Sequence, residues 1–134
     1  MNFDEIKESL EFLDDWEDRY KFVIDLGGDL PALEDAEKTK LAKVEGCVSQ
    51  VWLVVDEKEN NQLVFRGDSD AMIVKGLVAI VVSLFSNKSP QEVIDTPAQT
   101  ILEGLGLNEH LTSQRANGLR SMIDRVYAEA RARL

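Results

Sequence analysis

Several features that would point to a common enzyme or metalloprotein class are scarce or missing in this chain of 134 residues. Cys47 is the only cysteine, which excludes an intramolecular disulfide, a Cys-x-x-Cys redox pair and a multi-cysteine zinc or cluster site. His110 is the only histidine, so a hydrolytic triad or a typical metal site would have to be built around it. The sequence also lacks a Walker A loop, a dinucleotide-binding fingerprint and a Gly-x-Ser-x-Gly motif.

Long hydrophobic runs are missing as well. The longest apolar-rich run, residues 71–85, contains Lys75 and is too short and too charged to form a transmembrane helix. The first residues, Met1–Glu5, lack the basic and apolar regions of a signal peptide. Together with the single cysteine, these features lead us to expect a protein of the reducing cytoplasm.

Basic residues are outnumbered, with 15 Lys and Arg against 25 Asp and Glu and a net charge of −10. Such a protein is repelled by phosphate backbones and anionic lipids, so we expect neither nucleic acid nor membrane as a partner. Residues 1–37 hold 13 acidic and three basic residues and thus account for the whole net charge. Two interpretations stay open: a solvated helix face, or a surface that attracts a basic patch on a protein partner.

Hydrophobic spacing and local signals predict the order of helices and strands. Apolar residues at spacings of three and four predict a helix over residues 3–26 that Gly27-Gly28 ends. Ser69-Asp70 is typical of a helix start, and Ser89-Pro90 and Thr96-Pro97 each combine a capping residue with a proline at the first helical position.

The resulting prediction is one domain over residues 1–134 with an α+β fold, in which helices cover a small antiparallel sheet of two or three strands. The predicted helices cover residues 3–26, 71–85, 90–95, 97–103 and 112–133, and the predicted strands cover 51–55, 63–65 and, as a short addition, 43–45. Residues 56–62 should form the hairpin loop. We expect the helix over 71–85 to be buried almost all round, and Gly76 and Gly118 to mark close packing against another backbone.

Cys47 is the residue most suited to chemistry. It follows Gly46 where an irregular connector turns into the first long strand, and glycine there permits backbone conformations closed to other residues. An accessible thiolate would be a strong nucleophile, whereas a buried free cysteine would be a small apolar filler. The chemistry of the residue leaves both interpretations open. His110, between Glu109 and Leu111, fits a surface loop, although it would be the base if Cys47 belonged to a free-standing thiol enzyme.

The residues around Cys47 resemble a known family motif. The segment Glu45-Gly46-Cys47-Val48-Ser49-Gln50-Val51-Trp52 resembles that of the SufE family, the sulfur-acceptor partners of cysteine desulfurases in iron–sulfur cluster assembly. Three further blocks agree with this resemblance: Trp16–Tyr20 with Leu26-Gly27 and Leu30-Pro31, Gly67–Asp70 with Ile73–Leu77, and Leu111-Thr112 with Arg115 and Asn117–Leu119. Together they span nearly the whole chain in order.

The resemblance implies a SufE/IscU-like fold and a function. Cys47 would take the outer sulfur of a persulfide from a PLP-dependent desulfurase, SufS-like or CsdA-like, stimulate that enzyme and pass the sulfur toward a cluster-assembly scaffold. The protein would be an accessory sulfur carrier and not an enzyme, with no cofactor and no metal of its own. A single cysteine is enough for a carrier and too few for a cluster scaffold. Family members can form homodimers, although this sequence shows no diagnostic interface, and a non-catalytic interaction domain remains the bland alternative.

The resemblance also implies roles for neighbours of Cys47. Cys47 would rest in an apolar pocket, for which Val48, Val51 and the helix over 71–85 are the candidates, and turn outward on docking. Arg115 would stabilise a thiolate or persulfide anion or contact the desulfurase, and Asp70 would contact the cysteine loop. Taken alone, Arg115 is an ordinary first-turn arginine and Asp70 a favourable charge at a helix N-terminus.

Some residues of the motif blocks follow the family pattern and others depart from it. Gln50 and Trp52 complete the motif, and we expect Trp52 to lie in the core. Ser113 and Gln114 depart from the proline and serine that the family usually has before the arginine.

Overall fold

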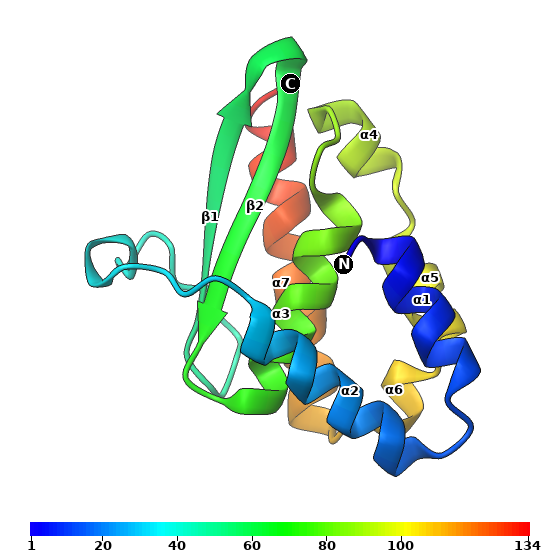
Figure 1. Ribbon diagram of the computed structural model, residues 1–134. Helices are drawn as coiled ribbons and strands as arrows, with labels where there is room; N and C mark the ends of the chain where they lie inside the picture. Colours follow the sequence, from blue (N-terminus) through cyan, green and yellow to red (C-terminus); the bar gives the residue numbers. More distant parts are fainter.

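The computed structural model describes the backbone of residues 1–134 and the side chains of residues 1–107 and 109–134. The elements, in chain order, are α1 (Phe3–Phe12), α2 (Trp16–Asp29), β1 (Val51–Lys58), β2 (Gln62–Ser69), α3 (Met72–Phe85), α4 (Pro90–Asp95), α5 (Ala98–Gly104), α6 (Leu107–His110) and α7 (Ser113–Arg131) (Figure 1). The predicted α+β class is confirmed. In the described part of the chain no helix combines the length and apolar character of a membrane span.

The sheet is a single antiparallel hairpin that is longer than the sequence pattern predicts. Its register runs from Val51 opposite Ser69 to Lys58 opposite Gln62. Residues 56–58, predicted to lie in the loop, belong to β1, because the turn is compressed into Glu59–Asn61. Asn60 and Asn61 take positive φ angles of 63° and 58°, which asparagine tolerates better than most residues. The short strand predicted at 43–45 is reduced to one bridge between Lys43 and Trp52.

The helix predicted over residues 3–26 is two helices. The break falls at Leu13–Asp15, where the Asp15 carboxylate accepts a hydrogen bond from the Glu17 N–H at 3.1 Å and begins α2. The apolar period runs on through the break because both helices bury their apolar side against the same core, with Ile6 and Leu10 from α1 and Val23 from α2. Periodicity alone therefore could not reveal the break.

The prediction that Gly27 ends a helix is wrong. Gly27 lies within α2, where this helix crosses α3. A Cβ atom on Gly27 would lie 2.6 Å from the Gly76 nitrogen, and one on Gly76 would lie 2.7 Å from the Val23 carbonyl carbon. Real Cβ atoms do not approach backbone atoms so closely. The two glycines thus let the helix backbones touch, which confirms the close packing predicted for Gly76.

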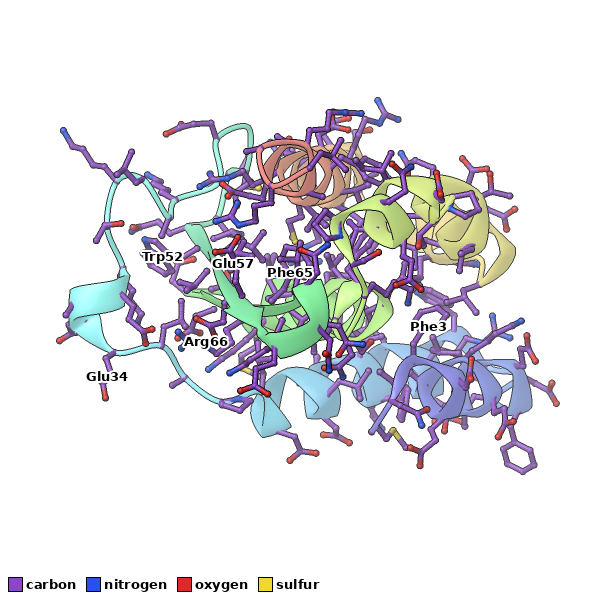
Figure 2. All side chains as sticks on the ribbon, turned by 90° about the horizontal axis from the view of Figure 1, so that it is seen from above. Phe3, Glu34, Trp52, Glu57, Phe65 and Arg66 are labelled. Atoms are coloured by element: carbon purple, nitrogen blue, oxygen red, sulfur yellow. The ribbon has the colours of Figure 1, made fainter. Side chains whose placement is uncertain are left out.

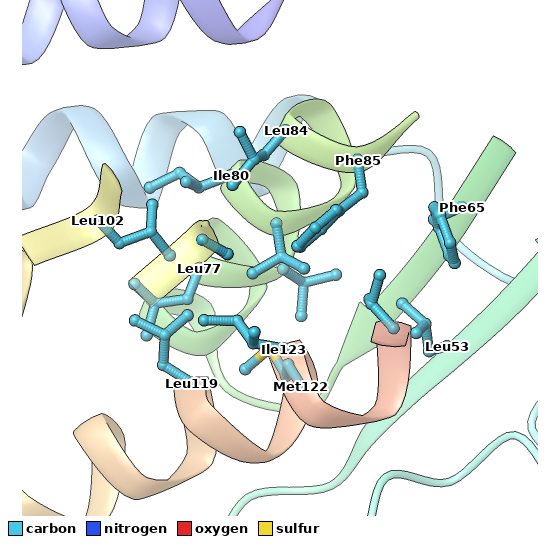
Figure 3. Close-up of a cluster of buried hydrophobic side chains, with 14 of the residues drawn as sticks. Leu53, Phe65, Leu77, Ile80, Leu84, Phe85, Leu102, Leu119, Met122 and Ile123 are labelled. Atoms are coloured by element: carbon cyan, nitrogen blue, oxygen red, sulfur yellow. The ribbon is translucent and has the colours of Figure 1, made fainter. Parts of the chain in front are cut away.

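Helix α3 is the centre of the core. The hairpin covers one side of it, while α2 and α7 cover others (Figure 1). Figure 3 shows its side chains meeting those of the strands, α5 and α7. The largest fully buried side chains around it are Phe65, Leu77, Ile80, Phe85, Leu102, Leu119, Met122 and Ile123. The prediction that α3 is buried almost all round is confirmed, although Met72 at its start is exposed.

The later helices follow their capping signals in part. Ser89 caps α4 with Pro90 in the first turn, as predicted. Thr96 instead donates its hydroxyl to the Glu92 carbonyl at the end of α4, so α5 begins one residue later than predicted, at Ala98. The short helix α6 was not predicted, and α7 ends at Arg131 instead of Arg133.

The connector between α2 and β1 extends along the outer face of the hairpin. Glu34 projects outward from it (Figure 2), while Glu37 forms an ion pair with Arg66 on β2. The same face carries Trp52, with the Lys38 ammonium 5.1 Å from its ring centre. Trp52 therefore lies on the opposite side of the hairpin from the core, contrary to our expectation.

Candidate functional site

Cys47 lies on a loop between the connector and β1, which we call the cysteine loop (residues 45–50). Gly46 has a φ angle of +90°, and a Cβ atom on it would also lie 2.5 Å from the Ser121 hydroxyl oxygen of α7. The backbone angle favours glycine at this position, and the short distance to a side chain of α7 shows how closely the loop approaches this helix. The loop therefore passes directly over α7, which sets where the thiol points.

The Cys47 thiol rests against α7. Its Sγ donates a weak hydrogen bond to the Gly118 carbonyl oxygen at 3.5 Å, and the residue is half-buried. A Cβ atom on Gly118 would lie 3.6 Å from Sγ. This is an ordinary van der Waals distance, so Gly118 faces the Cys47 side chain and does not mark close packing against another backbone, contrary to our expectation.

Next to the thiol is a cavity of about 220 Å³. Its lining residues are Cys47, Val48, Ser49, Val74, Leu77, Thr112, Gln114, Arg115, Gly118 and Met122. The side chains from α3 and Met122 make one part apolar, and the first turn of α7 makes another part polar. The expected contribution of Val48 and of the helix over 71–85 is present, whereas Val51 is fully buried and is not among the described lining residues. Of the lining residues from α7, Arg115 was expected from the family resemblance, whereas Gly118 and Met122 were not.

The environment of Cys47 favours the neutral thiol. Burial raises the pKa of the Cys47 thiol above its ordinary value, and the negative charge of Glu45 raises it further. The thiol at rest is therefore a poorer nucleophile than an exposed cysteine at the same pH.

Arg115 lines the same cavity, from the first turn of α7. The helix begins near Thr112, as predicted, and Thr112 caps it by accepting a hydrogen bond from the Arg115 N–H at 3.2 Å. The guanidinium of Arg115 donates to the Tyr20 hydroxyl of α2 at 2.9 Å. The structure thus brings a fixed positive charge to the cavity and holds it against α2.

Asp70 holds the far end of the cysteine loop. Its carboxylate accepts a hydrogen bond from the Gln50 N–H at 3.0 Å, and the Ser69 hydroxyl donates to the Gln50 carbonyl at 2.7 Å. The expectation that Ser69-Asp70 starts and caps α3 is wrong, because Ala71 occupies the cap position without a side-chain bond. The carboxylate is directed to the loop instead.

Asp68 is a structural residue of the site's surroundings that the sequence analysis did not single out. This buried carboxylate accepts hydrogen bonds from the N–H groups of Leu33 and Ser69, and it pairs with Lys38 and Lys75 at 3.6 and 3.4 Å. Burial by itself would raise its pKa, but these hydrogen bonds and the charge of Lys75 outweigh burial and leave the pKa lowered. Asp68 thereby fixes the connector to β2.

His110 is not part of the described lining of the cavity beside Cys47. Its ring stacks on Trp16 of α2, with ring centres 4.1 Å apart. The structure therefore gives no support to a Cys47–His110 pair. Over the described residues, moreover, no group of three or more His, Cys, Asp and Glu side chains is placed to hold a metal ion.

Comparison with known proteins gives concordant matches. The family model described as "SufE: Fe-S metabolism associated domain" matches residues 4–130. Two relatives named as uncharacterized SufE-like proteins are similar over nearly their whole length. The one from Rhizobium meliloti (strain 1021) is 51% identical, with 99% of this chain and 97% of the relative covered. The one from Rhizobium etli is 50% identical, with 98% and 91% covered.

A solved structure with the same fold supports the match. The solution structure of a hypothetical protein from Thermus thermophilus matches with a TM-score of 0.78 at 20% identity, covering 98% of this chain and 94% of that one.

Proposed function

The chain belongs to the SufE family, and from this premise we propose that it accepts sulfur on Cys47 from a PLP-dependent cysteine desulfurase and delivers it to iron–sulfur cluster assembly. In this role it is an accessory protein that stimulates a SufS-like or CsdA-like enzyme, and it works in the cytoplasm, where its single thiol stays reduced. The observation that carries the proposal is the placement of Cys47, on a glycine-containing loop beside a cavity.

The proposed step is a thiol–persulfide exchange. The Cys47 thiolate attacks the outer sulfur of the desulfurase persulfide, a new S–S bond forms, and the bond to the desulfurase cysteine breaks. The electron pair of that bond leaves with the desulfurase sulfur as a thiolate, so no external oxidant or reductant is needed. The proton of the Cys47 thiol has to be lost before attack, which the raised pKa of the resting site opposes.

The cavity gives the transferred sulfur a place to reside. It has about 220 Å³ of space beside Sγ, with apolar side chains on one part and Arg115 on another. We assign Arg115 the role of stabilising the thiolate or persulfide anion, or of contacting the desulfurase. We assign Asp70 the role of holding the cysteine loop through Gln50.

The acidic residues of the N-terminal part supply a surface for a basic partner. The acidic side chains of α1 and α2 are exposed, as Asp4, Glu5, Glu8, Glu11, Glu17, Asp18, Asp25 and Asp29. Exposed charges act mainly on the rate of encounter and are screened by salt. Binding to the desulfurase should therefore weaken as salt rises if this surface faces the partner.

The decisive experiment is mass spectrometry of the protein after incubation with a cysteine desulfurase and free cysteine. We expect Cys47 to gain the mass of one sulfur atom, and the gain to disappear on reduction. Cys47→Ser is the matched control, which should gain nothing, fold normally and fail to stimulate the desulfurase. A Cys47→Ser protein that stimulates fully would refute the proposal.

A further inference from the structure

The cysteine loop is rooted in the sheet, but the groups that receive its thiol lie on α7. The segment just before the loop, residues 41–44, which we call the loop root, pairs with β1: the Val44 N–H donates to the Val51 carbonyl, and the Leu53 N–H donates to the Ala42 carbonyl, both at 2.8 Å. The acceptor of the Cys47 thiol, Gly118, belongs to the helix. The Cys47 Sγ can meet the Gly118 carbonyl only if a contact fixes the position of the sheet relative to α7.

Arg125 of α7 makes this contact. Its guanidinium donates to two backbone carbonyls of the loop root, that of Lys43 at 3.1 Å and that of Leu41. Arg125 lies one helical turn beyond Ser121, the residue that touches Gly46, so both are on the side of α7 that faces the loop. One planar fork thus joins two successive parts of the loop root to the helix that carries the thiol's acceptor.

The guanidinium itself is held in place from the other side. Its Nε donates to Glu129 at 2.8 Å, and Glu129 also pairs with Arg133 at 2.8 Å. Arg133 in turn lies 3.4 Å from the Glu57 carboxylate of β1. Arg125 is three-quarters buried, so its bonds to Glu129 and to the Lys43 carbonyl are partly shielded from water, whereas its bond to the Leu41 carbonyl is exposed.

We propose that Arg125 is a positioning residue for Cys47: by tying the loop root to α7 it keeps Sγ against the Gly118 carbonyl and protects the thiol until a partner displaces the loop. The displacement of the loop by a partner rests on the proposed sulfur-acceptor function. Its structural part, protection of the thiol at rest, can be tested without a desulfurase. Arg125 touches neither the thiol nor the transferred sulfur and acts only through the backbone of residues 41 and 43.

The test is the rate at which iodoacetamide alkylates Cys47 in the folded protein. Arg125→Ala removes charge-assisted hydrogen bonds to two carbonyls, and the rate should rise about tenfold. Arg125→Lys keeps the charge near Glu129 but has no fork to reach both carbonyls, so its rate should lie between those of the wild type and Arg125→Ala. Arg120→Ala, which removes an exposed arginine of the same helix, should alkylate at the wild-type rate.

Low concentrations of urea separate loop release from general loss of stability. Alkylation through global unfolding accelerates with urea with the slope of the unfolding transition, whereas alkylation through a local loop opening is nearly independent of urea. We expect the accelerated alkylation of Arg125→Ala to be independent of low urea. If this variant does not fold, Arg125→Lys carries the same test.

The outcomes distinguish the two proposals. A wild-type alkylation rate in folded Arg125→Ala and Arg125→Lys, or an acceleration that follows the unfolding slope, overturns the role of Arg125 whatever the desulfurase does. Failure of the wild-type protein to gain sulfur overturns the acceptor function and leaves the alkylation result standing. Faster alkylation of the variants, together with sulfur gain by the wild type, supports both.

Discussion

The crossing of α2 and α3 permits a sharp test of the packing, by replacement of Gly76 with alanine. An alanine Cβ at position 76 would lie 2.7 Å from the Val23 carbonyl carbon. Ordinary van der Waals contacts between carbon atoms are about 3.5–4.0 Å, so the two helices would have to separate by about 1 Å. The obstacle is backbone and not the end of a flexible side chain, so no rotamer change can relieve it.

The expected loss of stability follows from two opposing effects. Alanine in a helix interior is favoured over glycine by about 1 kcal/mol. Overpacking of a well-filled interior costs about 1–3 kcal/mol and occasionally more, and a separation of helices across the centre of the core belongs at the upper end. We therefore expect Gly76→Ala to lower the free energy of unfolding by about 2 kcal/mol.

The assay is urea unfolding followed by far-ultraviolet circular dichroism, and Gly28→Ala is the matched control. Gly28 also lies in α2, is exposed, and a Cβ there would meet no atom within 4 Å. Gly28→Ala should therefore raise the free energy of unfolding by the helix preference of alanine alone, about 0.5–1 kcal/mol. The contrast in sign between the two variants isolates packing from helix preference.

A double variant extends the test. A Cβ on Gly27 would lie 2.6 Å from the Gly76 nitrogen, so Gly27→Ala strains the same crossing. Once one alanine has separated the helices, the second alanine costs less. The loss of unfolding free energy in the double variant should therefore be smaller than the sum of the two single losses by about 1 kcal/mol. A Gly76→Ala protein as stable as the wild type, or strict additivity with Gly27→Ala, would refute the reasoning.

Three further predictions concern the site and its supports. The alkylation rate of Cys47 should keep rising above pH 9.0, because burial and Glu45 raise the pKa of its thiol above that ordinary value; a plateau at lower pH contradicts this. Asp70→Ala should alkylate at Cys47 about threefold faster than the wild type, since the loop loses its hold on Gln50, whereas Asp70→Asn retains an acceptor oxygen and should not. Asp68→Asn should lower the free energy of unfolding by about 3 kcal/mol at neutral pH, as it removes the buried partner of two lysines. Because the folded-state pKa of Asp68 is lowered, its contribution is present above about pH 4 and lost as pH falls through the folded pKa. The urea-unfolding difference between Asp68→Asn and the wild type should therefore shrink in acid, and a constant difference contradicts the assignment.

Local signals were sufficient where structure depends on neighbours in sequence. The Ser89-Pro90 cap, the start of α7 near Thr112 and the apolar run of α3 each depend on residues within a few positions. The α+β class followed from the order of these elements. The hairpin was placed correctly and its length was underestimated. Polar residues 56–58 pair beyond the buried part of β1, and residues 66–69, which lack an apolar pattern, continue β2 to its pairing with Val51.

Signals with two meanings produced the errors. A glycine pair after an amphipathic helix is typical of a helix end, but Gly27 serves close approach to Gly76, which is 49 positions further along the chain. An aspartate before an apolar run is typical of a cap, but Asp70 binds Gln50 across the base of the loop. In both cases the choice depends on a partner that only the tertiary structure supplies.

The same limit applies to the site. Cys47 and Gly46 could be selected from the sequence because a lone thiol next to a glycine has recognisable chemistry. The contact of the thiol with Gly118 could not, because Gly118 lies 71 positions away from Cys47 and has no side chain that indicates a role, whereas Arg115 of the same helix was expected there from the family resemblance. Arg125 is a still clearer case, since an arginine near the middle of an amphipathic helix is ordinarily a solvated residue.

A carrier with a single thiol needs that thiol to react with its partner and with little else. In the resting structure Cys47 has a raised pKa, donates to Gly118 and is half-buried, and each of these features slows attack on stray electrophiles. The charge opposing ionisation comes from Glu45, which is part of the cysteine loop and therefore moves with it. Arg115 lines the cavity from α7 and donates to Tyr20 of α2, so it is anchored outside the loop. A desulfurase that draws the loop outward would therefore relieve the burial that raises the pKa, and return of the loop would bring the transferred sulfur back toward a fixed positive charge. On this reasoning, movement of the cysteine loop alone is enough both to protect the Cys47 thiol before transfer and to stabilise the persulfide after it.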